Sequence, residues 1–466
     1  MSVAQSTQTC ADLDGEKPAR TVWALAWPAV ALNALQTINS LLDSYFVQHL
    51  SVDNLTAIGA GTSVLFLFVS LSMALGTGAT ALVSRFFGAG ETDMFVTANQ
   101  KCLGLALIGG VLFAALSIPG SAALSQLLLP PNSGHSRTLM LQYLGIFALG
   151  LPAIFIVQSL AGSLRGIGDT RSPMVISGLQ IGMHITLNTL LINGPRTFPN
   201  GFHLPGANMG LAGAATALSA SAWVAAAVYI WWAQRTPLRA NLKISWPGLE
   251  WTSRILKISI PAAMMSLVRV TSLMAFTSIL ARVPGADAAI GALRPAFSIE
   301  SLAFMPAFGL SIAAAALVGQ SLGMKRPDRA ARLAWVAAHN GAAVSLTASV
   351  LLFVFSRPIA HAVMPDQPEV AAFVSQFLKY ICLTEVLFAY GMVFVGALQG
   401  AGDTVRPLWM TVASMWGLRV PLAGLLALGF GLGADGCWIS MSLTQAIQGV
   451  IAIILFRQGA WKTNTV

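Results

Sequence analysis

Long apolar runs follow one another along almost the whole chain, and they limit what it can fold into. Charged residues make up 9% and hydrophobic residues 56% of the 466 residues, whereas a soluble domain carries about 25% charged residues. A run of about 20 apolar residues crosses the bilayer core as a helix, because a helix satisfies its own backbone hydrogen bonds. The sequence therefore predicts an all-α, multi-pass membrane protein.

Hydropathy divides the chain into about 12 transmembrane helices. The loops between them are short, so we expect one compact bundle without a soluble domain. The predicted spans are 22–46, 55–84, 95–118, 138–163, 174–194, 209–233, 253–281, 288–318, 330–355, 374–397, 408–431 and 435–456.

A glycine-rich motif occurs twice, as GSLRGIGDT at 162–170 and as GALQGAGDT at 396–404. The copies match at a constant offset of 234 and follow the fourth and the tenth predicted span. Because six spans separate them, both copies face the same side of the membrane. The chain is therefore predicted to contain two parallel six-helix repeats with a central cleft between them. The matched loop residues include Gly166, Gly168, Asp169 and Pro173 in the first copy and Gly400, Gly402, Asp403 and Pro407 in the second.

This repeated loop is interpreted as a structural connection. Its glycines permit positive φ or close helix approach, its aspartate or threonine can cap the next helix, and its proline suits a first helical turn. A gating role is the alternative. A dinucleotide-binding fingerprint (GxGxxG) does not fit, because no third glycine stands at the place that this pattern requires and no strand precedes the motif.

The repeat divides the chain into two lobes, 22–234 and 253–456, with a linker at 235–252 and tails at 1–21 and 457–466. If the N-terminus is cytoplasmic, that side holds 18 of the 26 Lys and Arg residues and the other side holds 6. The positive-inside rule then places both tails and the linker in the cytoplasm, and we predict a protein of the cytoplasmic (inner) membrane. The rule also accounts for the net charge of +9, so nucleic acid is not an expected partner.

Polar residues inside two spans of the first half fall on single helix faces, at spacings of three or four residues. An ionisable group in hydrocarbon costs a few kcal/mol, so these stripes are interpreted as a hydrated pocket that binds the coupling cation or proton at Asp43. For the amides, the alternative is that they join helices by hydrogen bonds. The stripes consist of Gln36, Asn39 and Asp43 in the first span and of Gln180, His184 and Asn188 in the fifth.

The second half carries two acids and two arginines within its spans, which suggests internal ion pairs. Glu300 lies among aromatic and methionine residues, surroundings that suit a lipophilic cation. Glu385 lies nearer the end of its span, where water can reach it. The candidate residues of the substrate cleft are Glu300, Arg269, Phe297, Phe304, Met305, Arg419 and Glu385.

Enzyme and metal signatures are absent from the sequence. It contains no HExxH, GxSxG or Walker A motif, and its four cysteines lack metal-binding spacing. We therefore expect no enzymatic activity, no metal site and no cofactor. Without a nucleotide site, transport has to be driven by an ion gradient.

The chain resembles the MATE (multidrug and toxic compound extrusion) family from Pro28 to about Arg457. The segments that carry the resemblance are LLDSYFVQHL (41–50) with LTAIG (55–59), the paired LRGIGDTRSP and LQGAGDTVRP, RPAFSIESLAFMPAFGLSIAAAALVGQSLGMKRPDRA (294–330) and RVPLA (419–423). The resemblance implies a secondary antiporter that exports small organic cations and drugs by alternating access, in exchange for H⁺ or Na⁺. We expect it to act as a monomer in the lipid bilayer.

The resemblance also bears on the coupling ion. Asp43 matches the acid of the family's first span, and Asn188 matches the asparagine of the same cation site in the fifth. Four residues later the family pattern has a second acid, where this chain has Ile192. An acid expected in the seventh span is replaced by Arg269. Both departures favour H⁺ over Na⁺.

The sequence leaves three other functions open. A major facilitator-type carrier also has two parallel halves, but it usually has a basic loop between spans two and three, where this chain has SRFFGAGETDMF. A lipid-linked oligosaccharide flippase of the same superfamily would prefer a cleft rich in arginine. An intramembrane enzyme would turn over a lipid or peptide without any gradient.

Overall fold

The structure is a computed structural model, and it describes residues 18–47, 52–129, 134–197, 203–239 and 245–464. These residues are helical nearly throughout, which confirms the predicted all-α class. The helices of the first half are α1 (Pro18–Val47), α2 (Val52–Gly88), α3 (Thr92–Leu128), α4 (Gly134–Gly166), α5 (Arg171–Leu191) and α6 (Gly210–Ala233). Those of the second half are α7 (Gly248–Leu280), α8 (Ala286–Gly323), α9 (Pro327–Val354), α10 (Ser356–Val363), α11 (Pro368–Cys382), α12 (Glu385–Gly400), α13 (Val405–Val412), α14 (Val420–Gly424) and α15 (Gly433–Arg457).

Shorter elements complete the described chain. A two-residue antiparallel ladder, β1 (Arg196–Thr197) with β2 (His203–Leu204), follows α5. The 3₁₀ turns are η3 (Pro237–Arg239) and η6 (Ala460–Thr463), and the π-helical turns are η4 (Ala413–Arg419) and η5 (Leu425–Gly429).

Within the described residues, ten helices are long and apolar enough to cross a membrane, and an eleventh candidate is a bent pair. In that pair α11 and α12 meet at 63°, so the predicted tenth span is broken. The predicted first span corresponds to α1, whose 30 residues extend about 45 Å. It is not among the ten, and it carries Asn33, Gln36, Asn39 and Asp43 within its length.

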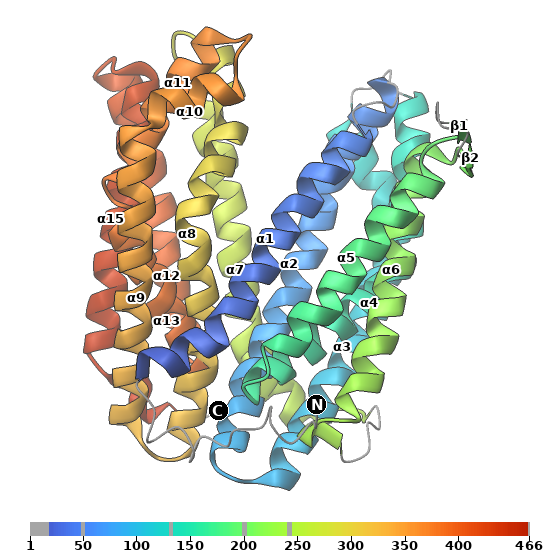
Figure 1. Ribbon diagram of the computed structural model, residues 1–466, viewed down its shortest axis with the longest axis vertical. Helices are drawn as coiled ribbons and strands as arrows, with labels where there is room; N and C mark the ends of the chain where they lie inside the picture. Colours follow the sequence, from blue (N-terminus) through green and yellow to red (C-terminus); the bar gives the residue numbers. More distant parts are fainter. Residues whose placement is uncertain (1–17, 48–51, 130–133, 198–202, 240–244, 465–466) are drawn as a thin grey trace. The chain divides into compact units, whose positions relative to one another are not determined.

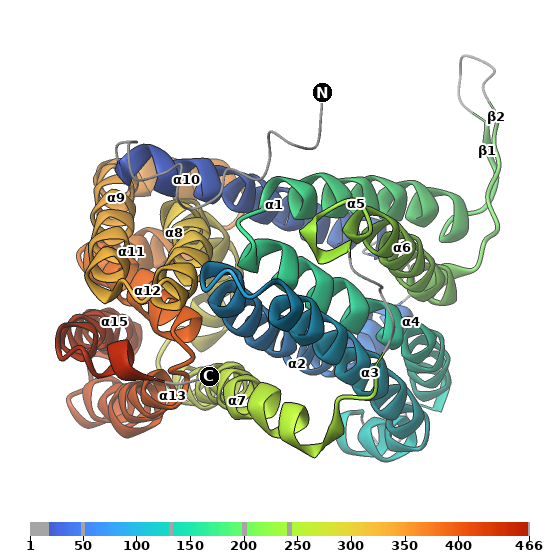
Figure 2. The same cartoon turned by 90° about the horizontal axis from the view of Figure 1, so that it is seen from below.

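The described residues form two compact units. One comprises residues 31–83 and 91–259 of the described chain, and the other comprises 18–30, 84–90 and 260–464. Three helices, α1, α2 and α7, therefore contribute to both units, whereas the predicted lobes assign each helix whole. In the first unit α3 lies beside α4 and α5 beside α6 (Figure 2). In the second, α12 packs against α8, α9 and α15 (Figure 1).

Aromatic rings fill one end of the core of the second unit. Phe394 stacks on Phe456 at 4.5 Å between ring centroids, and Phe456 stacks on Trp461 at 4.7 Å. Trp461 is fully buried although it lies in the predicted C-terminal tail. Its neighbour Lys462 donates from Nζ to Oδ1 of Asp328 at 3.0 Å. Part of that tail is therefore packed into the unit.

The two copies of the glycine-rich loop have the same backbone geometry. The glycine directly before the aspartate of each copy has a positive φ, 88° at Gly168 and 80° at Gly402, a conformation that favours glycine. In each copy the aspartate amide donates to the carbonyl of the leucine five residues earlier, at 2.9 Å. These bonds run from Asp169 to Leu164 and from Asp403 to Leu398.

The loop aspartates organise the helices that follow. Oδ1 of Asp169 accepts from the backbone N–H of Ser172 at 2.9 Å, which satisfies a free donor at the start of α5. Asp403 accepts from Nη1 of Arg406 at 3.1 Å. Burial raises the pKa of Asp403, and the Arg406 charge opposes that rise. Pro173 and Pro407 are each the third residue of the helix after the loop.

Small residues let helices of each half approach closely, at equivalent places. A Cβ added at Gly162 would overlap the backbone of Gly76, and one added at Gly396 would overlap Ser311. One turn after Gly396, a Cβ at Gly400 would overlap the carbonyl oxygen of Ala315. α4 therefore approaches α2 in the first half as α12 approaches α8 in the second.

The close approach at Gly400 can be tested by Gly400→Ala. The added methyl group meets backbone atoms that cannot rotate away, so we expect a loss of about 1–3 kcal/mol and a clearly lower melting temperature in detergent. Gly145→Ala in α4 is the control, because nothing lies within 4 Å of a Cβ there. Equal melting temperatures for the two variants would contradict the packing described here.

Candidate functional site

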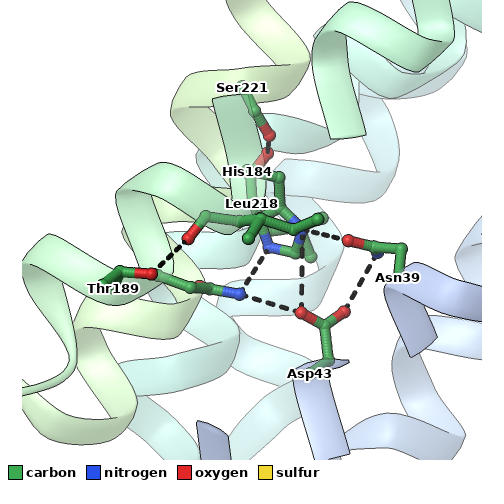
Figure 3. A network of polar contacts seen from close by, with 8 residues as sticks. Asn39, Asp43, His184, Thr189, Leu218 and Ser221 are labelled. Atoms are coloured by element: carbon green, nitrogen blue, oxygen red, sulfur yellow. Dashed lines mark hydrogen bonds and ion pairs between the residues drawn. The ribbon is translucent and has the colours of Figure 1, made fainter. Parts of the chain in front are cut away.

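Four polar side chains from α1 and α5 form the polar centre of the first unit (Figure 3). Asn39 and Asp43 lie four residues apart on α1, and His184 and Asn188 lie four residues apart on α5. Side chains at this spacing share a helix face. Each helix therefore presents one amide and one ionisable group to the other.

The four side chains are joined in a ring of hydrogen bonds. Asp43 accepts from Nδ2 of Asn39 at Oδ2 (3.1 Å) and from Nδ2 of Asn188 at Oδ1 (2.8 Å). His184 closes the ring, with Nδ1 at 3.2 Å from Oδ1 of Asn39 and Nε2 at 3.4 Å from Nδ2 of Asn188. Nδ1 of His184 also lies 3.7 Å from Oδ1 of Asp43.

Burial differs within this ring. Asn188 is 2% exposed and the His184 side chain 7%, whereas the side chain of Asp43 is 37% exposed. The carboxyl group is therefore within reach of water. Oδ1 of Asn188 is buried without a hydrogen-bond partner among the described residues.

Three further residues bear on the ring, and two of them, Gln36 and Ile192, are named from the sequence. Gln36, which the sequence places on the same stripe of α1, is exposed and takes no part in the ring. Tyr143 of α4, which sequence reasoning missed, is buried and interacts electrostatically with Asp43. Ile192 is 2% exposed and directly follows α5.

The second unit contains a separate polar cluster around Glu300. Oε1 of Glu300 accepts from Nε2 of Gln445 at 3.3 Å, and Arg419 lies close enough to interact with it electrostatically. Arg419 donates from Nε to Oγ1 of Thr444 at 2.9 Å, and its carbonyl accepts from Oγ of Ser440 at 2.7 Å. Sequence reasoning missed the α15 partners, although Ser440, Thr444 and Gln448 form a polar stripe at i, i+4 and i+8 in an apolar helix.

Glu385 lies at the break between α11 and α12. It is the first residue of α12 and is fully buried, although the sequence suggested access to water. Both carboxyl oxygens lack a hydrogen-bond partner among the described residues, and Glu385 interacts electrostatically with Glu300.

The other predicted cleft residues do not gather on the Glu300 carboxyl group. Phe297 meets Phe377 edge to face at 5.4 Å between ring centroids, and Phe304 meets Phe388 at 6.0 Å. Met305 is half-buried on the same helix. Arg269 is exposed and interacts electrostatically with Arg419. Among the described residues, no group of three or more His, Cys, Asp or Glu side chains could hold a metal ion.

The two acids of the second unit should respond in opposite ways to neutralisation. Glu385→Gln replaces a buried carboxyl group that has no hydrogen-bond partner among the described residues by an amide that brings its own N–H donor to a cluster rich in acceptors. We therefore expect the stability to rise by about 1–3 kcal/mol and the melting temperature to rise with it. Glu300→Gln leaves the buried Arg419 without its acid, so we expect destabilisation. Melting curves near neutral pH compare the two, and a destabilising Glu385→Gln would show that this carboxyl group has a partner.

Comparison with known proteins places this chain in a family. The MatE family model matches residues 28–190 and 261–425. The probable multidrug resistance protein NorM of Thermotoga maritima is 30% identical over 450 residues, which cover 95% of this chain and 93% of that protein. The multidrug resistance protein MdtK of Photorhabdus laumondii is 25% identical, with 96% of each chain covered.

Solved structures show the same fold. An outward-facing multidrug resistance MATE transporter of the MOP superfamily superposes with a TM-score of 0.88 at 21% identity, covering all of both chains. A MOP superfamily transporter from Pyrococcus furiosus gives 0.87 at 21% identity and covers 98% of this chain and all of the other. With a family match in each half and a relative at 30% identity, this chain belongs to the MATE family of multi-pass membrane transporters.

Proposed function

We propose that this chain is a proton-coupled antiporter that exports small organic cations, including drugs, across the cytoplasmic membrane by alternating access. Asp43 binds and releases the coupling proton. The carrying observation is an ionisable carboxyl group inside a membrane helix, held by two amides and still 37% exposed. An acid at this place costs folding free energy, so its presence in a membrane helix indicates a function.

The donors around Asp43 favour a proton over a metal cation. Both amides turn their N–H groups toward the carboxylate, and Oδ1 of Asn39 turns toward His184. N–H groups repel a bare cation, whereas Na⁺ needs several oxygen ligands. No lysine or arginine among the described residues forms an ion pair with Asp43, so its charge is free to change during transport.

The position of the second family acid supports the same choice. Ile192 stands there, buried and directly after α5, so Asp43 has no acidic partner one turn from Asn188. A single carboxyl group neutralises with one proton and offers too few oxygens to chelate Na⁺.

Orientation and substrate complete the proposal. The excess of Lys and Arg in the loops on the N-terminal side supports cytoplasmic termini. The names of the relatives NorM and MdtK as multidrug resistance proteins support drugs as substrates. The chain would act as a monomer that needs no cofactor and has no enzymatic activity.

Asp43→Asn tests the coupling site. The amide is nearly isosteric but cannot release a proton, so we expect proton-driven efflux of a cationic dye from proteoliposomes to fall to background while the protein remains folded. Asp53→Asn is the control, because Asp53 lies in the same unit and accepts a bond from Ser136 without contacting the ring. Wild-type pumping by Asp43→Asn would place coupling elsewhere, with Glu300 the next candidate.

Sodium dependence tests the missing acid. At fixed pH, we expect transport by the wild-type protein to be unchanged when Na⁺ is replaced by K⁺. Ile192→Asp should introduce Na⁺ sensitivity or move the pH optimum upward, because two neighbouring carboxyl groups titrate as a coupled pair. Ile192→Asn controls for added polarity. A requirement for Na⁺ in the wild type would overturn the assignment of coupling to Asp43.

A further inference from the structure

The ring between α1 and α5 determines the protonation state of His184. Asn39 and Asn188 each donate from Nδ2 to the Asp43 carboxylate, which accepts and cannot donate when ionised. The orientation of both amides follows from these two bonds. Oδ1 of Asn39 therefore faces Nδ1 of His184, and Nδ2 of Asn188 faces Nε2.

An acceptor opposite Nδ1 and a donor opposite Nε2 leave one consistent form of the imidazole. Nδ1 carries the hydrogen and donates to Asn39, while Nε2 is unprotonated and accepts from Asn188. A protonated ring would bring Nε2–H against the N–H of Asn188. In this ring His184 is neutral, and the carboxylate sets its tautomer through the two amides.

We infer that His184, one turn before Asn188 on α5, is a positioning residue for the proton site. This rests on the proposed role of Asp43. A locked imidazole holds both amides with their N–H groups toward the ionised carboxylate. When Asp43 takes up a proton, the protonated oxygen becomes a donor and a weaker acceptor, so the bond from its amide weakens and the contact between α1 and α5 changes.

Among the described residues, two titratable groups are placed near His184. Asp43 faces it from α1, and Tyr143 of α4 interacts with Asp43. From α6, Leu218 and Ser221 lie beside the ring in Figure 3, and neither titrates. A change in pH dependence after substitution of His184 therefore reports on Asp43.

The pH profile of efflux tests this role. His184→Leu removes the acceptor of one amide and the donor to the other, so the carboxylate loses directed donors and keeps its proton to higher pH. We expect the acidic limb of the profile to move upward by about one pH unit. His184→Gln can donate and accept at the same places, and it should return the limb toward its wild-type position whatever its effect on rate.

Three results would overturn the inference. An unmoved limb in His184→Leu would make His184 a packing residue, and equal shifts in the Leu and Gln variants would mean that the imidazole itself carries a proton. A shift of the same size in Thr186→Val would show a general effect of substitution in α5, because the Thr186 hydroxyl bonds only to its own helix at Gly182 among the described residues.

A spectroscopic measurement separates this inference from the proposed function and needs no transport. Nitrogen NMR of the histidine side chains near neutral pH, assigned by the signal lost in His184→Gln, should show a protonated Nδ1 and an unprotonated Nε2. The opposite tautomer would overturn the inference even if Asp43→Asn abolishes efflux. If Asp43→Asn still pumps, the proposed function fails while the tautomer result stands.

Discussion

Hydrocarbon contains no water to satisfy a polar group, so a side-chain amide or acid within a span needs a partner elsewhere in the protein. In the first unit the four side chains of α1 and α5 meet this requirement together. The contact between these helices is therefore directional as well as close. Its geometry depends on the ionisation of one carboxyl group, which links chemistry at Asp43 to the packing of two helices.

The repeat does not carry this site into the second half. At the repeat offset of 234, the positions equivalent to Asp43, His184 and Asn188 are Thr277, Leu418 and Leu422, and none of them is ionisable. Polar groups of the second unit lie instead on α8, α12 and α15, around Glu300. There acceptors outnumber donors, because Glu385 and the side-chain oxygens of Gln445 and Gln448 lack partners among the described residues. The two halves share a fold and have diverged in their buried chemistry.

Most features that the sequence predicts correctly follow from apolar length and helix periodicity. The spans, the repeated loop and the facing stripes of α1 and α5 all follow from apolar length and from spacing along a helix. The break before Glu385 could not be predicted in this way, since an apolar run looks the same whether the helix is straight or bent. The partnership of Glu300 with Gln445 joins residues 145 positions apart, and spacing along one helix says nothing about such pairs. Trp461 falls in the predicted tail, because burial by tertiary packing leaves no pattern in the neighbouring sequence.

A single acid with a neutral imidazole gives the site a different charge balance from a pair of acids. With Asp43 ionised the ring carries one negative charge, and one proton makes it neutral, whereas two acids would need two protons or a metal cation. The ionised state is also the one in which both carboxyl oxygens accept most strongly, and protonation weakens at least one ring bond. If Asp43 carries the coupling proton, the charged form is therefore held rigidly and the neutral form is freer to rearrange. That ordering suits an antiporter, because a neutral ring meets the smaller electrostatic cost when its surroundings change from water to hydrocarbon.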